Sequence, residues 1–138
     1  ALMTGPEAMI ELFHGYTYSG HPVACAAGLA TLDVYEREQL LTRGASLAGT
    51  WEDALHSLRD CPHVVDIRNL GIIGAIELAP REAGAGSRAY EAMVGLFEAG
   101  VLMRYTGDTL ALSPPLILED EHIERIVDTT RKVLAGIS

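Results

Sequence analysis

Apolar residues form a nearly continuous run over one segment near the start of the chain, at a length typical of a helix. Ser19 precedes this segment and can serve as its N-cap, and Pro22 suits its first turn. The apolar run continues from Val23 to Tyr35. We therefore predict a helix here and expect it to be largely buried.

A second helix is predicted from about Leu47 to Leu58, after a break at Gly44. Its apolar side chains recur at helical spacing and form one stripe, made of Leu47, Trp51, Ala54, Leu55 and Leu58. Trp51 therefore belongs to the predicted core and not to a site.

Two more helices are predicted in the second half of the chain. One covers about residues 87–98, ends at Gly100 and has an apolar face formed by Tyr90, Met93, Val94 and Phe97. The other starts after Glu119, with acidic residues in its first turn and Arg131 and Lys132 in its last, the polarity that the helix dipole favours. Its predicted buried stripe is made of Ile123, Ile126, Val127, Thr130 and Leu134.

The pattern changes to strands in two places. From Val64 the run VVDIRNLGIIGAIELAP is rich in β-branched residues and is interrupted by Gly71 and Gly74, which predicts a hairpin. VLMRY and TLALS, joined by the turn TGD, predict a second hairpin. The order helix, helix, two strands, helix, two strands, helix does not alternate as a Rossmann unit does. We therefore expect an α+β fold, a small, mostly antiparallel sheet with helices packed on one face.

Composition and charge narrow the class of protein. The 138 residues suit a single domain, and 49% of them are hydrophobic, without the long apolar run of a membrane span. The net charge of −9 has the wrong sign for nucleic acid, so a nucleic acid is not an expected partner. A membrane is not an expected partner either, because that apolar run is missing.

Cys25 and Cys61 form no CxxC pair, which favours a reducing cytoplasm. Cys61-Pro62-His63 is too short and isolated for a metal site, and no metal is expected.

The chain opens on Ala-Leu, without an initiator methionine or the basic start of a signal peptide. It then runs into a polar, glycine-containing loop with no preceding element to support it. We expect it to be a piece of a longer protein.

The segment FHGYTYSGHPVACAA places glycines and hydroxyl side chains directly before a predicted helix N-terminus. Backbone N–H groups and hydroxyls at such a place form a natural anion site. The alternative is a capped helix start with aromatic side chains packed on it, which is commoner in proteins.

Arg104 is the second candidate, in a predicted strand beside a tight turn. Its planar fork of five donors suits a carboxylate. The alternative is an ion pair within the chain, with Asp108 or Glu77. The sequence contains no GxSxG elbow, Ser-His-Asp order or inward pair of carboxylates that would favour hydrolytic chemistry.

Three runs carry a family likeness: HGYTYSGHPVACAAGLATLDVYE, VVDIRNLGIIGAIEL and GVLMRYTGDTLALSPPLILEDEHIERI. Together they resemble the C-terminal part of the class III aminotransferases, which depend on pyridoxal 5'-phosphate, and most closely the omega-amino acid:pyruvate transaminase subgroup. The resemblance implies the C-terminal small domain of a fold-type I aminotransferase over residues 21–138, preceded by a cofactor-phosphate loop and lead-in over residues 1–20. Aminomutases share this fold, but His21 in GHP and Arg104 favour the transaminases.

The resemblance also implies roles for three residues. Thr17, with the backbone next to Tyr16, resembles the pair that contacts the cofactor phosphate across a homodimer interface. Arg104 resembles the arginine that binds the substrate carboxylate and swings aside for an apolar or amine substrate. The implied reaction moves an amino group from an amine or omega-amino acid to a keto acid such as pyruvate.

The family's Schiff-base lysine, its aspartate on the cofactor ring nitrogen and the aromatic residues around the ring lie upstream of the matching segment. The only lysine here is Lys132, for which a solvated ammonium is expected. We therefore expect no catalytic residue on this chain and no activity from it alone. The rival interpretation is a non-catalytic α+β module that binds small anions or mediates oligomerisation.

Overall fold

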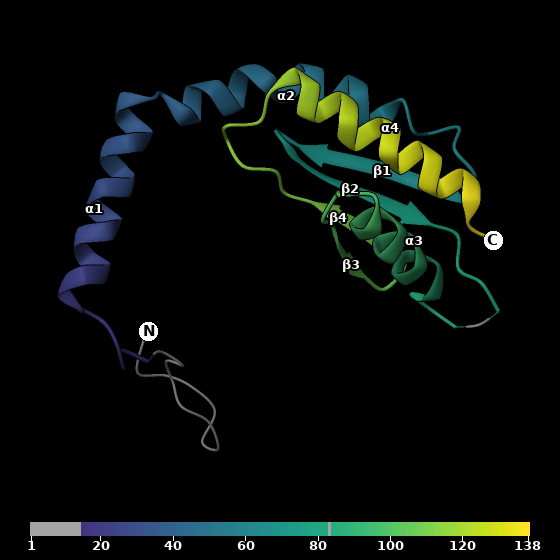
Figure 1. Ribbon diagram of the computed structural model, residues 1–138, viewed down its shortest axis with the longest axis horizontal. Coiled ribbons are helices and arrows are strands. Elements are labelled where there is room, and N and C mark those ends of the chain that lie inside the picture. The colour runs from purple at the N-terminus through teal and green to yellow at the C-terminus, as the bar shows by residue number, and fades with distance from the viewer. Residues whose placement is uncertain (1–14, 83) are drawn as a thin grey trace, which may run out of the picture. The chain divides into compact units, whose positions relative to one another are not determined.

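The computed structural model describes residues 15–82 and 84–138. Within them lie four helices and four strands (Figure 1): α1 (Pro22–Arg37), α2 (Leu40–His56), β1 (Val64–Leu70), β2 (Ile73–Leu78), α3 (Ser87–Glu98), β3 (Arg104–Thr106), β4 (Thr109–Leu112) and α4 (Asp120–Gly136). The predicted order of elements is confirmed. The chain divides into two compact units, one ending at Glu38 and the other running from Gln39 to Ser138. Each is described by itself.

Helix α1 belongs to the first unit. Its N-cap is His21, whose side chain makes no capping hydrogen bond, and Pro22 occupies the first turn. The prediction of Ser19 as N-cap is wrong, because Ser19 lies in the preceding turn, where its N–H donates to the Tyr16 carbonyl at 3.0 Å. The fixed φ of proline suits the first helical position, so Pro22 sets the start of the helix.

The expected burial of α1 is also wrong, since none of its residues is buried. An apolar helix becomes buried only when a second layer covers it. Among residues 15–38 of the first unit, α1 is the only helix or strand, so no second layer of described residues covers it.

The four strands of the second unit form one antiparallel sheet in the order β1-β2-β4-β3. β1 and β2 form one hairpin, and β3 and β4 form the other. The turn residues Gly71 and Gly107 have φ of +56° and +54°, a conformation that glycine adopts without strain. Both predicted hairpins are confirmed, but the predicted interruption at Gly74 is wrong, because Gly74 lies within β2 and pairs with Asn69 and Leu112.

One face of the sheet forms the floor of the core. Ile67, Ile76 and Leu110 lie side by side on it across β1, β2 and β4, and all three are buried. Helices α2, α3 and α4 pack over this face (Figure 1). The predicted α+β architecture, with helices on one face of an antiparallel sheet, is confirmed. No helix in the described part of the chain is long and apolar enough to cross a membrane.

Helix α2 begins at Leu40, so the predicted break at Gly44 is wrong. Gly44 is buried inside the helix, where an added Cβ would lie 2.7 Å from Leu116 Cδ2. Gly44 thus lies where the Leu116 side chain packs closely on α2, and it does not end the helix. The predicted apolar stripe is confirmed at its centre, where Trp51, Leu55 and Leu58 are fully buried.

The predicted bounds of α3 are confirmed, as is its end at Gly100, which has a φ of +85°. The Gly100 and Val101 N–H groups donate to the carbonyls of Phe97 and Leu96, the pattern of a Schellman motif.

The predicted face of α3 is wrong. Tyr90 and Phe97 are 52% and 63% exposed, while Arg88, Ala89, Ala92 and Leu96 are buried. The small alanines form the buried face together with Leu96. Arg88 is buried because its guanidinium donates to the carbonyls of Ala79, Pro80 and Ser138.

Helix α4 carries most of its predicted stripe: Ile123, Val127, Thr130 and Leu134 are buried, and Ile126 is partly buried. The prediction that Arg131 and Lys132 lie in its last turn is wrong, because the helix continues to Gly136. Arg131 instead donates to the carbonyl and hydroxyl oxygens of Ser57, each at 3.1 Å.

Candidate functional site

Arg104 is the first residue of the edge strand β3 and points away from the helices. The face on which it lies is called the outer face here; it carries Asp66, Arg68, Leu70, Ile73, Ala75, Glu77, Arg104, Thr106, Thr109 and Ala111. Across the four strands, Arg104 stands in one row with Ala111, Ala75 and Arg68. The two arginines at the ends of this row are thus separated by two small side chains.

The guanidinium of Arg104 is exposed, and no carboxylate pairs with it among residues 15–82 and 84–138. The alternative prediction, an ion pair with Asp108 or Glu77, is wrong. Asp108 Oδ1 accepts the Gly86 N–H at 2.7 Å, and Glu77 Oε2 accepts from Arg68 Nη1 at 2.8 Å. Arg104 therefore keeps its donors for a group from outside these residues.

Two contacts hold the short strand that carries Arg104. On the face toward the helices, Tyr105 meets Tyr90 of α3 edge-on, with ring centroids 5.6 Å apart. Gly86 lies against the β3–β4 turn, where an added Cβ would be 3.0 Å from the Gly107 carbonyl oxygen. This packing was not predicted from the sequence, although the glycine-rich stretch AGAGS was a signal of it.

A second polar cluster lies on the outer face. Arg68 Nη1 donates to Asp66 Oδ2 at 2.6 Å and to Glu77 Oε2 at 2.8 Å. The hydrogen bonds to Asp66 and then Glu77 raise the pKa of Arg68 above its ordinary value. These three residues are not among the site residues predicted from the sequence.

The turn 17–20 precedes α1 in the first unit. Thr17 is exposed, Tyr16 is 70% exposed, and Gly20 has a φ of +78°. His21, at the N-cap of α1, makes no capping hydrogen bond with its side chain, so this residue does not provide the capped start predicted as the alternative. Uncapped N–H groups at a helix N-terminus, with an exposed hydroxyl nearby, can receive an anion. Thr17 and Arg104 belong to different units, and the site of each is described within its own.

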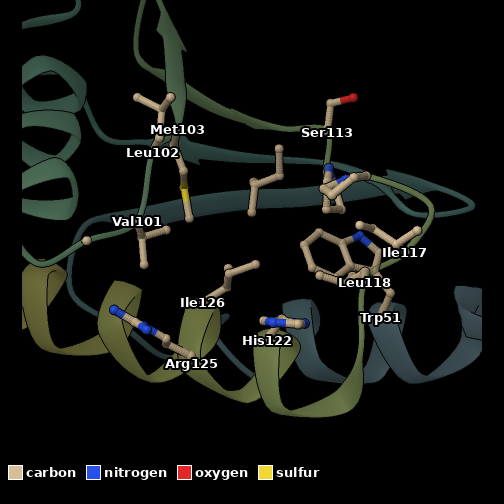
Figure 2. Close-up of a pocket in the computed structure, with 14 residues that line it drawn as sticks. Trp51, Val101, Leu102, Met103, Ser113, Ile117, Leu118, His122, Arg125 and Ile126 are labelled. Carbon is tan, nitrogen blue, oxygen red and sulfur yellow. The ribbon is translucent and has the colours of Figure 1, made fainter.

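A mostly apolar groove of about 440 Å³ lies within the second unit. Figure 2 shows His122, Arg125 and Ile126 of α4 on one side of it and Met103 on the other, with the Trp51 ring at one end. None of the three predicted site residues lines this groove.

The chain was compared with known protein families and with curated proteins. The family described as Aminotransferase class-III matches residues 1–134. The chain is 57% identical to an omega-aminotransferase of Caulobacter vibrioides, over 99% of this chain and 31% of that protein. It is 44% identical to a beta-alanine–pyruvate aminotransferase of Pseudomonas aeruginosa, over 96% of this chain and 30% of that protein. The chain thus spans about a third of the length of these relatives.

Solved structures show the same likeness. A thermostable omega transaminase variant from Pseudomonas jessenii superposes with a TM-score of 0.82 and 33% sequence identity, over 91% of this chain and 29% of that one. The family match extends over nearly the whole chain, and the sheet with helices on one face agrees with the structural match. The chain belongs to the class III aminotransferase family.

Proposed function

We propose that this chain supplies the C-terminal part of an omega-amino acid:pyruvate type transaminase, which moves an amino group from an amine or omega-amino acid to a keto acid. The observation that carries the proposal is the exposed guanidinium of Arg104, which no carboxylate of the described residues engages. The names of the similar proteins, omega-aminotransferase and beta-alanine–pyruvate aminotransferase, support it. The proposal is tested by the Arg104→Ala variant, whose activity is expected to fall with substrates that carry a carboxylate and not with substrates that lack one, as argued in the Discussion.

In this proposal Arg104 binds and orients the substrate carboxylate. A guanidinium can form two parallel hydrogen bonds with a carboxylate, so it fixes the direction of the substrate as well as neutralising its charge. Because Arg104 is exposed at the edge of the sheet, its side chain can also turn away when a substrate carries no carboxylate. This gives one site that accepts both amines and amino acids.

The cofactor of the proposed enzyme is pyridoxal 5'-phosphate, and the turn before α1 fits its phosphate. Thr17 would donate its hydroxyl, and the backbone next to Tyr16, together with the uncapped end of α1, would add N–H groups. When bound, the cofactor supplies an electron sink for the transfer. In the proposed homodimer, Thr17 reaches the cofactor held by the partner, and the division at residue 20 between this loop and the small domain stays a prediction.

The 138-residue chain alone is expected to show no transamination when mixed with the cofactor. Its single lysine, Lys132, is exposed on α4, and we assign no catalytic residue to this chain. Borohydride reduction followed by peptide mass analysis checks this. Stoichiometric trapping of the cofactor on Lys132 would contradict it, whereas weak, random modification would not.

Thr17→Ala in the full-length protein is expected to weaken cofactor retention by about tenfold, equal to about 1.4 kcal/mol, because one hydrogen bond to a charged group is lost. The backbone N–H groups remain, which limits the effect. Equilibrium dialysis of the cofactor measures the change. Thr17→Ser is the matched control and is expected to bind like the wild type, because it keeps the hydroxyl.

A heterodimer tests whether the contact crosses between subunits. One chain carries Thr17→Ala, and the other has the cofactor-binding lysine replaced. If the contact is made in trans, the one lysine-bearing site borrows an intact Thr17 from its partner and keeps wild-type affinity. If that site instead binds the cofactor as weakly as the Thr17→Ala homodimer does, the contact is made within one chain. Unchanged affinity in the homodimer would mean that Thr17 does not bind the phosphate.

A further inference from the structure

Two carboxylates share the outer face with Arg104. Glu77 of β2 is opposite Thr109 of β4, which in turn is opposite Thr106 of β3, so Glu77 lies one row along from Arg104 and two strands away. Asp66 is opposite Glu77 on β1, one strand further from Arg104. Both carboxylates are bonded to Arg68.

The surface between Arg104 and Glu77 offers no obstacle to an arginine side chain. Ala111 and Ala75 are the neighbours of Arg104 along its row, and both are small. Two strand spacings and the offset of one row together amount to about 12 Å, a distance that an extended arginine and a glutamate can bridge together. Glu77 is therefore the nearest competitor on this sheet face for the guanidinium of Arg104.

Arg68 prevents this competition in the structure. Its Nη1 stands 2.8 Å from Glu77 Oε2 and 2.6 Å from Asp66 Oδ2, so one guanidinium engages both carboxylates. The two carboxylates and the one guanidinium of this cluster together have a net charge of −1. At about 12 Å through solvent and salt, more than one Debye length, that charge attracts Arg104 far less than a direct contact would.

We propose that Arg68 is a positioning residue for substrate binding, which engages Glu77 and Asp66 and so leaves Arg104 free to take the substrate carboxylate. This inference rests on the proposed function, in which Arg104 is the carboxylate-binding residue. The guanidinium of an arginine stays charged at every pH at which an enzyme works, so Arg68 holds the two carboxylates throughout that range.

The test replaces Arg68 with methionine in the full-length holoenzyme, which keeps an unbranched stem and removes the charge. We expect the KM for pyruvate to rise about three- to sixfold. A Glu77–Arg104 pair as strong as a surface ion pair would leave Arg104 unpaired in only about a third to a sixth of the enzyme molecules, and only those molecules could bind pyruvate. The kcat at saturating pyruvate stays within twofold of the wild type. The KM for butanal, an acceptor without a carboxylate, does not change.

Three variants serve as controls. Arg68→Met combined with Glu77→Gln is expected to return the KM for pyruvate to within twofold of the wild type, because the competing carboxylate is gone. Arg68→Lys is expected to resemble the wild type, since an ammonium still engages Glu77. Arg81→Met breaks another ion pair of the same unit, Arg81–Glu91 at 2.6 Å, and is expected to leave both KM values unchanged.

An unchanged KM for pyruvate in Arg68→Met, an equal rise for butanal, or a failure of Glu77→Gln to rescue would each overturn the inference. If Arg68→Met does not fold, Arg68→Gln replaces it. Its amide is neutral and removes the charge as methionine does, so the same increase of about three- to sixfold is expected, and no increase overturns the inference as well.

The Arg104→Ala variant separates this inference from the proposed function. If Arg104→Ala leaves the KM for pyruvate unchanged, the proposed function itself fails. If Arg104→Ala raises that KM and Arg68→Met does not, only the role of Arg68 fails. If the proposed function and the role of Arg68 are both correct, adding Arg68→Met to Arg104→Ala does not raise the KM for pyruvate any further. The reason is that Arg104, the residue for which Glu77 competes, is already absent.

Discussion

Replacing Arg104 with alanine in the full-length protein is expected to lower kcat/KM for amino-acid and keto-acid substrates by about ten- to a hundredfold. The variant loses a charge-assisted hydrogen bond to the substrate carboxylate, which contributes about 1.5–3 kcal/mol. Turnover of an amine donor with butanal as acceptor should stay within about twofold of the wild type, because neither compound carries a carboxylate. Steady-state kinetics with both substrate pairs measures the difference.

Arg104→Lys is the matched control for this prediction. A lysine keeps the positive charge but cannot form the two parallel hydrogen bonds of a guanidinium, so an intermediate loss is expected for carboxylate substrates. The selectivity of the effect matters more than its size. Equal losses for the two substrate pairs would show that Arg104 supports the structure of the strand and does not bind substrate.

Trp51→Ala is expected to destabilise the second unit by about 3–5 kcal/mol, the usual range for removal of a large aromatic side chain from a core. Trp51 is fully buried, and it packs so closely on the sheet that a Cβ added at Gly74 would lie 3.4 Å from its Nε1 and 2.5 Å from Leu55 Cδ2. Urea unfolding of the 138-residue chain, followed by far-ultraviolet circular dichroism, measures the loss. Fluorescence is unsuitable, because Trp51 is the only tryptophan.

Two variants of α2 sharpen this prediction. Trp51→Phe keeps a ring in the core and removes an indole N–H that has no hydrogen-bond partner among the described residues, so we expect it to lose less than half as much stability. Leu41→Ala, at a position 68% exposed, is expected to change stability by no more than about 0.5 kcal/mol. Similar losses from Trp51→Ala and Leu41→Ala would mean that Trp51 is not a core residue.

The hairpins were predictable from the sequence because their signals are local. β-branched residues favour strands, and the glycines at 71 and 107 adopt the positive φ that the turns require. The same is true of the end of α3 at Gly100, where the chain needs a left-handed residue. Each of these features depends on residues a few positions apart, and no other part of the chain has to be known.

The errors arose where a distant segment decides the role of a residue. Gly44 is a residue typical of a helix break, but it lies within α2, where Leu116 from far along the chain packs beside it. Arg88 is buried in a helix whose larger apolar residues Tyr90 and Phe97 face outward, because carbonyl groups of other segments satisfy its guanidinium. Hydrophobic periodicity carries no information about such partners.

The candidate site divides in the same way. The sequence pointed to Arg104 and Thr17 through the residue types that surround them, because a guanidinium beside a turn and hydroxyls before a helix suit anions whatever their neighbours. Whether Arg104 is free or paired depended on the strand register, which puts Asp66 opposite Glu77, both within reach of Arg68, and leaves Arg104 two strands away from Glu77. Hydrogen bonding between strands set that register. Only the folded sheet could therefore show which arginine holds the carboxylates and which one is left for a ligand.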